Sequence, residues 1–242
     1  MPDFIVPDWP APPNVRAVST TRRGGRSTGP YESFNLGGHV GDDPVAVAAN
    51  RELLKLQLPL QPCWLNQVHG TRCIDADTAD DGAEADASVS RRGRRACAIL
   101  TADCMPILLC DDAGSVVAAA HAGWRGLAAG VVEAAVASMN VPPGRIFAWL
   151  GPAIGPRAFE VGDEVRAAFV GGDAGAIEAF APHGAGKWLC DLHALARRRL
   201  MTLGVVSIHA DSSCTFTDRD RFFSYRRDGA TGRMASAIWL QK

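Results

Sequence analysis

The sequence lacks any run approaching the roughly 18 uninterrupted apolar residues that a membrane-spanning helix needs. It also lacks an excess of either charge, because 25 lysines and arginines stand against 26 aspartates and glutamates. This balance excludes a general electrostatic attraction to nucleic acid or to anionic membranes, so we expect neither as a partner. Any bound anion must be held by a few local arginines.

The first residues, MPDFIVPDWPAPP, lack the basic start and the apolar stretch of a secretory signal, so we expect a cytoplasmic protein. The seven cysteines are odd in number and irregularly spaced, which in a reducing compartment predicts buried thiols, with one or two chemically active. No internal repeat, low-complexity run or linker divides the chain, and we expect a single domain over residues 1–242.

Helices are predicted where an aspartate cap or a helical spacing of apolar residues marks their course. They cover residues 44–56 after Asp43, 126–139, 163–169 with Asp163 as cap, and 192–203 between Asp191 and Gly204. Short apolar runs predict strands at 98–100, 107–110, 116–120, 146–150, 205–209 and 234–240. The polar segment 75–95 is interpreted mainly as surface loop, with a short strand near 87–89. Because strand runs often follow each other directly, we predict an α/β fold of the α+β type, with mixed sheets layered between outer helices.

Polar clusters interrupt the apolar strands at three places, and each contains a strong metal ligand: His69 in NQVHG, Cys104 in TADCMP and His121 in HAGWRG. Each cluster is typical of a strand that runs into a tight turn, and loops at strand ends form the ligand crevice of α/β proteins. Two imidazoles and one thiolate suit Zn²⁺, and three protein ligands leave a fourth position for water or substrate.

Spacing alone is a weak signal for this site, because the ligands are 35 and 17 residues apart (69 to 104 and 104 to 121), unlike those of a zinc finger. Hydrogen-bonded histidines and a buried structural thiol at Cys104 are the commoner fate of such residues.

Arginines offer candidate anion sites at three places. Arg22 lies in the segment STTRRGG among hydroxyl groups and glycines, and Arg125 lies beside His121. The segment SYRRDG at 224–229 is predicted to be a strand that leads into a hairpin with an Asp-Gly turn. Each arginine can instead be a solvated surface residue, and the loop GPAIGP at 151–156 either supplies backbone donors or is a simple turn.

The motifs QVHG, TADC, HAGWRG, LGPAIGPRAFEVG and SYRRDGATGR, with the opening TTRRGG, resemble in order and separation those of the YfiH family. This family is also called the laccase-domain or polyphenol oxidoreductase family and includes the peptidoglycan editing factor. The resemblance covers roughly residues 19–240 and implies a layered α/β fold with zinc bound by His69, Cys104 and His121. It also implies phosphorolysis of adenosine, inosine and methylthioadenosine, deamination of adenosine, and an anion-binding role for Arg22.

On this basis we predict that a purine nucleoside and phosphate are bound by Arg22, Arg125 and Gln67. Asp103, which adjoins Cys104, is the candidate for proton transfer, or else a partner that fixes the tautomer of a ligating histidine. Copper is a possible alternative to zinc, because Cu²⁺ outranks Zn²⁺ in general affinity.

Three alternatives stay open. Cys104 with His69 or His121 fits the thiolate nucleophile of an amidase or related hydrolase that acts on a peptidoglycan precursor. A copper-dependent polyphenol oxidase is the second, although only six histidines are present, no two of them separated by a single residue, which argues against an ordinary multicopper enzyme. A non-enzymatic zinc scaffold is the third, and it requires a fourth protein ligand that the sequence does not offer. The oligomeric state is left open.

Overall fold

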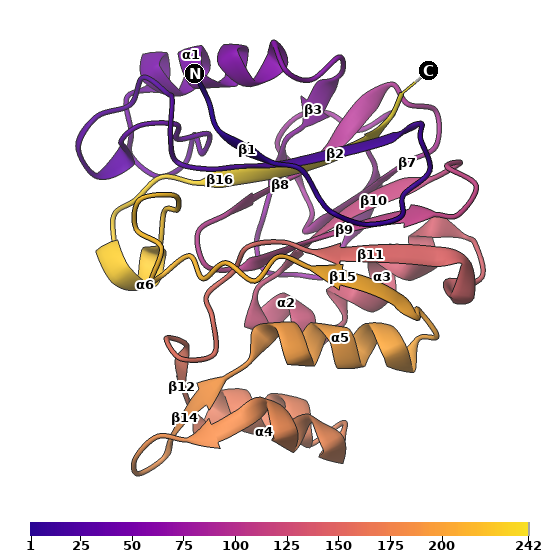
Figure 1. Ribbon diagram of the computed structural model, residues 1–242, viewed down its shortest axis with the longest axis vertical. Helices are drawn as coiled ribbons and strands as arrows, with labels where there is room; N and C mark the ends of the chain where they lie inside the picture. Colours follow the sequence, from indigo (N-terminus) through magenta and orange to yellow (C-terminus); the bar gives the residue numbers. More distant parts are fainter. Residues whose placement is uncertain (242) are drawn as a thin grey trace.

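A computed structural model describes residues 1–241 as two stacked sheets with helices on their outer faces (Figure 1). The first sheet has the order β1 (Phe4–Ile5), β2 (Val15–Thr20), β16 (Met234–Leu240), β8 (Arg95–Thr101), β3 (Gln61–Cys63). The second has the order β15 (Ser207–Ala210), β11 (Ile146–Leu150), β9 (Met105–Asp111), β10 (Val117–Ala122), β7 (Ala87–Ser90), β5 (Cys73–Asp75). Both sheets contain parallel and antiparallel pairs, so the predicted mixed α/β architecture is confirmed.

The helices lie outside the two sheets. Helix α1 (Pro44–Lys55) covers the first sheet, and α2 (Trp124–Ala129), α3 (Val131–Met139) and α5 (Leu192–Thr202) cover the second (Figure 1). A short helix, α6 (Tyr225–Asp228), and the two-stranded pair β4 (Leu65–Asn66) and β6 (Ala83–Glu84) complete this body. Short 3-10 helices are found at Gly29–Tyr31, Pro143–Arg145 and Ala174–Ala179.

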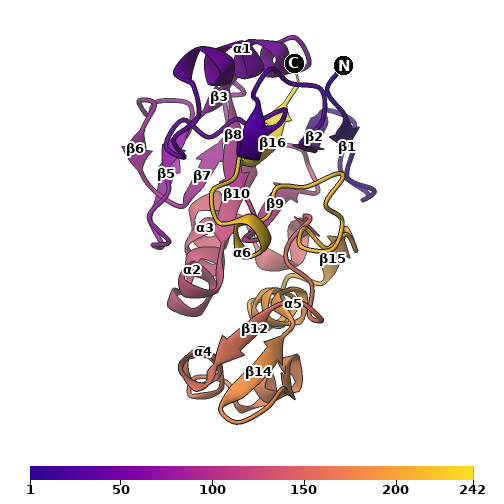
Figure 2. The same ribbon diagram turned by 90° about the vertical axis from the view of Figure 1, so that its left-hand side faces the viewer.

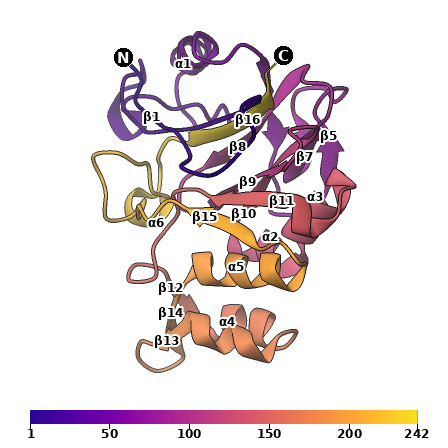
Figure 3. The same cartoon turned by 45° about the vertical axis from the view of Figure 1, so that its right-hand side comes forward.

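A smaller unit projects from the helical side of the body (Figures 2 and 3). It consists of the sheet β12 (Glu160–Gly162), β14 (Lys187–Cys190), β13 (Phe180–Pro182) and of helix α4 (Asp163–Val170). Apolar side chains of this unit, such as Val165 and Phe169, share one hydrophobic cluster with Leu195 of α5. This continuous packing agrees with the one-domain interpretation, which stays a prediction.

The core follows from strands that are apolar on both faces. On β9, Ile107 and Leu109 belong to the cluster under the helices, whereas Leu108 and Cys110 pack between the two sheets. This alternation is the two-residue period of a strand, and burial on both faces explains why β9 is an almost continuous apolar run. No helix within residues 1–241 is long and apolar enough to cross a membrane.

Two predicted helices have the expected caps. The Asp43 carboxylate accepts a hydrogen bond from the Val45 amide at the start of α1, and Asp191 accepts one from Ala194 at the start of α5. The helix predicted over 126–139 is instead two helices, because Gly130 at φ 106° adopts a left-handed conformation that ends α2.

Two further predictions were wrong in detail. Residues 224–229 do not form a hairpin: the hydroxyl of Ser224 accepts from the Arg227 amide and starts α6. Asp163 does not cap α4, because Gly162 takes that position and the Asp163 carboxylate accepts from the indole of Trp188. Within segment 75–95 the predicted short strand near 87–89 is confirmed as β7, which is buried and lies between β10 and β5. Strand β2 was not among the predicted elements.

Candidate metal centre and its cavity

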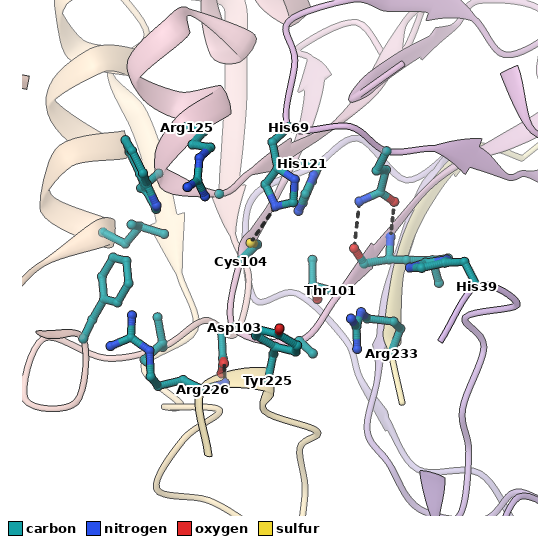
Figure 4. A pocket seen from close by; sticks show the side chains of 18 residues that line it. His39, His69, Thr101, Asp103, Cys104, His121, Arg125, Tyr225, Arg226 and Arg233 are labelled. Atoms are coloured by element: carbon teal, nitrogen blue, oxygen red, sulfur yellow. Dashed lines mark hydrogen bonds between the residues drawn. The ribbon is translucent and has the colours of Figure 1, made fainter. Parts of the chain in front are cut away.

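The three predicted ligands meet because their strands end at the same place. In the antiparallel pair β9 and β10, His121 lies opposite Pro106 and Ala122 opposite Met105. Cys104 directly precedes β9, so it lies beside the end of β10 that carries His121. His69 follows β4 in a loop that packs against this turn, and its Nε2 lies 3.7 Å from the Cys104 sulfur (Figure 4).

The geometry fits a single zinc ion. One ligand atom from each of His69, Cys104 and His121 can be chosen so that all three lie within 4.8 Å of one another. The two imidazole rings are 4.8 Å apart between centroids and inclined by 60°. Tetrahedral zinc bonds of about 2.0–2.3 Å place neighbouring ligand atoms about 3.5 Å apart, so small side-chain rotations complete the site. The donor set of two imidazoles and one sulfur therefore fits the metal that the sequence predicts.

Asp86 organises two of these ligands, and it was not among the predicted site residues. Its carboxylate is fully buried and accepts a 2.8 Å hydrogen bond from Nδ1 of His121. It also accepts from the backbone amides of Val68, His69 and Gly70 at 3.1, 3.0 and 2.7 Å. Burial alone raises the pKa of Asp86, but these hydrogen bonds outweigh burial and lower it. Asp86 thus fixes the His121 tautomer, leaving Nε2 for a metal, and holds the loop that carries His69.

Two residues of the site have unusual backbone conformations. His69 has φ 60° and Asp103 has φ 92°, and residues other than glycine rarely adopt positive φ values of this kind. The amides that Asp86 binds hold the first, and the hydrogen bond from the Ile154 amide to the Asp103 carbonyl holds the second. Such conformations persist only where surrounding contacts fix them, as they do around functional sites.

The pKa values of Cys104 and His121 favour a proton on the imidazole of His121 over one on the sulfur of Cys104. Burial raises the pKa of Cys104, but the adjacent imidazoles of His121 and His69 outweigh this effect and lower the pKa to about 6. Burial lowers the pKa of His121, whereas Cys104 and Asp86 raise it, to about 9. The sulfur is therefore presented as a thiolate, the form that binds metal.

These ligands line a cavity of about 590 Å³. In Figure 4 the ligand group lies between two sides, with Arg125 and Arg226 on one and Arg233 and His39 on the other. The Arg125 guanidinium lies 4.5 Å from the ring centroid of Trp124, and that of Arg226 lies 5.3 Å from the centroid of Phe159. Both rings line the same cavity. The cavity therefore joins a wall of aromatic rings with two arginines, a metal-ligand group, and a side that carries Arg233 and His39.

The structure places most of the other predicted residues at this cavity. Gln67 and Arg125 line it. The Gln67 amide is paired with the backbone of Leu100, donating to its carbonyl and accepting from its amide, both at 2.8 Å. Arg125 is exposed at the cavity mouth. Their roles in binding substrate stay predictions.

Asp103 lines the cavity, but its carboxylate is hydrogen-bonded to Thr215 and Arg226 and not to a ligating histidine. One carboxylate oxygen accepts from the Thr215 hydroxyl and the other from the Arg226 amide, both at 2.7 Å. The side chain thereby fastens the start of α6 to the turn that carries Cys104. The predicted tautomer-fixing contact with a ligating histidine is made by Asp86 and not by Asp103.

Arg22 does not line this cavity. It borders a separate depression of about 320 Å³, with Arg219 and Asp220 among the neighbouring residues. Its Nε donates to the Glu32 carbonyl and its Nη1 to the Arg219 carbonyl, and its guanidinium lies over Phe223. The arginines at the cavity are instead Arg125, Arg226 and Arg233. The placement gives no support to the predicted contact between Arg22 and a phosphate at this cavity.

The residues of this site that sequence reasoning did not single out are Asp86, Arg233 and Gly123. The signal for Asp86 was a lone carboxylate at the start of the buried run DASVS. That for Arg233 was its position immediately before the C-terminal strand. Gly123 was visible in HAGW, where only a residue without a side chain lets the chain approach the metal ligands.

Gly123 supplies a first test of the site. A Cβ added at this position would lie 2.7 Å from the Cys104 sulfur and 3.0 Å from Cδ2 of His69, closer than packed atoms tolerate. We expect Gly123→Ala to lower zinc content and to reduce activity on the order of 10²-fold, because sub-ångström displacement of reacting groups has effects of this size. The control is Gly172→Ala, whose Cβ would meet nothing within 4 Å. Equal zinc content and activity in the two variants would show that the approach at Gly123 is unimportant.

The family described as Multi-copper polyphenol oxidoreductase laccase matches residues 16–241. A purine nucleoside phosphorylase of Pseudomonas aeruginosa is 55% identical over 239 residues, which cover 98% of both proteins. The purine nucleoside phosphorylase YfiH of Escherichia coli is 53% identical over 243 residues, covering 99% of this chain and 100% of that protein.

Solved structures agree with these matches. A Neisseria meningitidis protein superposes with a TM-score of 0.97 at 53% sequence identity, with 99% of each chain covered. The YfiH protein of Bacillus licheniformis superposes with a TM-score of 0.88 at 32% identity, covering 94% of this chain and 93% of that one.

The family description names several coppers, but the ligands present suit one ion. Among residues 1–241, His69, Cys104 and His121 are the one group of three or more His, Cys, Asp or Glu side chains close enough to share a metal. A blue-copper site and a multinuclear cluster need many more imidazoles than this. The sequence motifs, the profile match and the near-identical folds together place the chain in the YfiH, or laccase-domain, family.

Proposed function

We propose that this protein is a zinc-dependent purine nucleoside phosphorylase. It would convert adenosine and inosine to the free base and ribose 1-phosphate, and methylthioadenosine to adenine and 5-methylthioribose 1-phosphate. The observation that carries the proposal is one cavity that presents a three-residue metal-ligand group together with three arginines. The names of the Pseudomonas aeruginosa and Escherichia coli relatives, both purine nucleoside phosphorylases, support it.

The cavity has the size and charge for these two substrates. A volume of about 590 Å³ falls within the usual range of small-molecule sites and suits a nucleoside with one phosphate. Its cations are Arg125, Arg226 and Arg233, and its carboxylate is that of Asp103, whose two oxygens are engaged with Thr215 and the Arg226 amide. The excess of positive charge favours an anionic substrate such as phosphate.

The reaction needs no nucleophile from the protein. A phosphate oxygen forms the bond to C1′ of the ribose while the bond from C1′ to the base nitrogen breaks, and the electron pair leaves with the base. The proton that the phosphate loses balances the one that the base gains. A zinc ion held by His69, Cys104 and His121 supplies positive charge that stabilises negative charge developing in the reaction. An arginine of the cavity binds and orients the phosphate, and the aromatic wall of Trp124 and Phe159 excludes water from the base.

Deamination of adenosine belongs to the same proposal as a second activity of this site. Water attacks C6 of the base, the bond from C6 to the amino nitrogen breaks and ammonia leaves, so the reaction does not depend on phosphate. Asp103 is the carboxylate nearest in sequence to the ligands, but both of its oxygens already accept hydrogen bonds. Proton transfer by Asp103 would therefore require that it give up one of these contacts.

A second function is favoured by the contacts among Cys104, His121 and Asp86. A thiol next to an imidazole that a buried carboxylate orients is the arrangement of a cysteine hydrolase. This arrangement would attack an amide, such as one in a peptidoglycan precursor, and it would work without metal. A zinc scaffold is less well supported, because no fourth His, Cys, Asp or Glu among residues 1–241 joins the ligand group.

The deciding experiment is incubation of metal-analysed protein with adenosine, with and without phosphate, followed by identification of the products. We expect adenine and ribose 1-phosphate only when phosphate is present, and loss of that activity when a chelator removes zinc. Inosine formed without phosphate would establish the deaminase activity. The phosphorylase proposal fails if zinc-loaded protein yields no free base. The cysteine hydrolase is supported if metal-free protein cleaves an amide and alkylation of Cys104 stops this cleavage.

A further inference from the structure

The two sides of the cavity differ in chemistry. One side has Trp124 and Phe159 with the guanidinium groups of Arg125 and Arg226 stacked over their rings. The other has Arg233, whose guanidinium lies 5.9 Å from the ring centroid of Tyr225, with His39 nearby. Thr101 lies between Arg233 and Cys104 (Figure 4). The metal-ligand group separates them.

Arg233 is held in one orientation by backbone contacts. Its neighbour Met234 pairs with Thr101 across β16 and β8, so Arg233 lies beside the turn that carries Cys104. Its amide donates to the Asn35 side chain at 2.8 Å, and its Nη1 donates to the carbonyls of Thr231 and Gly232 at 2.9 and 3.0 Å. Gly37 packs on the aliphatic stem, where an added Cβ would come within 2.8 Å of the Arg233 Cγ.

The charge of Arg233 has no carboxylate partner. The ion pairs found among residues 1–241 do not include it. The side chain is half-buried, and burial lowers the pKa of its guanidinium. Its Nε and Nη2 donate to no acceptor in the described part of the chain, and both belong to a group that faces the cavity. A partly desolvated guanidinium of this kind is costly unless an anion completes its contacts.

The arginines of the opposite side are placed differently. Arg125 and Arg226 are exposed, and Arg226 gives its Nη1 to the Glu160 carbonyl. Beneath them the wall is apolar, since Ile154 and Leu192 line the cavity together with the two rings. Planar, apolar surface suits a purine ring better than a hydrated dianion.

We propose that Arg233, with the Thr101 hydroxyl and His39 beside it, forms the phosphate subsite, and that the wall of Trp124 and Phe159 binds the purine base. The inference rests on the proposed phosphorylase function and assigns each substrate to one side of the ligand group. Phosphate and nucleoside would then approach the reacting centre from opposite sides. Arg22, in its separate depression, takes no part in this subsite.

The test of the phosphate subsite is direct binding of inorganic phosphate to zinc-loaded protein, measured by calorimetry without nucleoside. We expect Arg233→Met to weaken phosphate binding by about 10- to 100-fold, the loss of one or two charge-assisted hydrogen bonds. The KM for phosphate should rise by a similar factor while the KM for nucleoside stays within about threefold. Arg92→Met is the matched control, because Arg92 is exposed and does not line the cavity.

The outcomes separate this inference from the proposed function. Phosphate binding that depends on Arg233 in a protein without phosphorolysis would refute the proposed function and leave the anion subsite standing. Unchanged phosphate affinity in Arg233→Met, a rise in the KM for nucleoside alone, or no phosphate binding by the wild type would each overturn the inference. Zinc content and thermal melting of Arg233→Met must equal those of the control. If they do not, Gly37→Ala, which displaces the Arg233 stem without removing charge, serves as the second variant and should weaken phosphate binding in the same way.

The base wall has its own variant. Trp124→Leu removes the ring under Arg125 and should raise the KM for nucleoside by about tenfold, the value of stacking one base, with phosphate binding unchanged. Trp188→Leu is the control, because Trp188 also stacks with an arginine, Arg166 at 4.4 Å, but lies outside the cavity lining. An unchanged KM for nucleoside in Trp124→Leu would overturn this half of the assignment.

Discussion

Replacing Cys104 with alanine is expected to give a folded protein that retains little zinc and loses nucleoside phosphorolysis by about 10³-fold or more. Cys104 is the single sulfur donor of the ligand group, and two imidazoles alone do not complete a stable zinc site. A metal ion that stabilises developing charge contributes several kcal/mol to the transition state, and each 1.4 kcal/mol corresponds to about a tenfold change in rate. Zinc content by elemental analysis and initial rates of base release measure the two effects.

The matched control is Cys73→Ala. Cys73 is also half-buried and free, but it lies on the edge strand β5 outside the cavity lining. We expect this variant to keep full zinc content and activity. A Cys104→Ala protein that binds one equivalent of zinc as tightly as the control would contradict the ligand assignment. One that binds no zinc but still releases base at the wild-type rate would contradict the role of the metal.

Asp86→Asn is expected to weaken zinc binding by about 10- to 100-fold and to lower activity by a similar factor, the usual effect of removing a carboxylate behind a ligating histidine. The carboxylate accepts from Nδ1 of His121 and from three successive backbone amides, those of residues 68–70. The asparagine side chain has one oxygen acceptor and one NH₂ donor. Its NH₂ group would face at least one of the four N–H donors that the carboxylate now accepts from, and two donors do not form a hydrogen bond. The tautomer of His121 is then no longer fixed, and the loop that carries His69 loses hydrogen bonds that hold it in place.

Zinc affinity is measured by competition with a chromophoric chelator, and the melting temperature of the zinc-free protein is followed in parallel. Asp112→Asn is the control, because Asp112 is an exposed carboxylate paired with Arg145 on the surface. Zinc affinity within twofold of the wild type in Asp86→Asn would show that the buried carboxylate does not organise the ligands. Lower stability of the zinc-free protein with unchanged affinity would assign Asp86 a structural role only.

The local part of this site could be predicted from the sequence. His69, Cys104 and His121 each end an apolar strand run, and strand ends in layered α/β proteins converge on one crevice. The Asp43 and Asp191 caps were predictable for the same reason, since a cap acts within three residues of itself. For these two caps, which depend on neighbours in sequence, pattern and outcome agree.

The long-range part could not be predicted. Asp86 and His121 are 35 positions apart in the chain and meet only because β7 pairs with β10. Arg233 faces the cavity because β16, the C-terminal strand, lies next to β8, which is more than 130 positions earlier in the chain. Arg22 had the local features of an anion site, yet the surrounding backbone carbonyls take up its guanidinium. Pairing of distant strands decides which polar residue faces the cavity, and local composition does not encode it.

The α6 segment shows how one hydrogen bond changes a local prediction. The Asp-Gly pair at 228–229 favours a hairpin turn, but Ser224 caps a helix and the Asp103 carboxylate binds the Arg226 amide in its first turn. The result is a helical turn that carries Arg226 and Tyr225 to the cavity.

X-ray absorption at the zinc edge tests the central claim most directly. The account predicts one zinc per chain with a single sulfur at about 2.3 Å and about three nitrogen or oxygen neighbours near 2.0 Å, two of them from imidazoles. In Cys104→Ala protein reloaded with zinc, the sulfur shell should be absent. A zinc shell without sulfur in the wild-type protein, or one with two or more sulfurs, would contradict the assignment of His69, Cys104 and His121 as the metal centre.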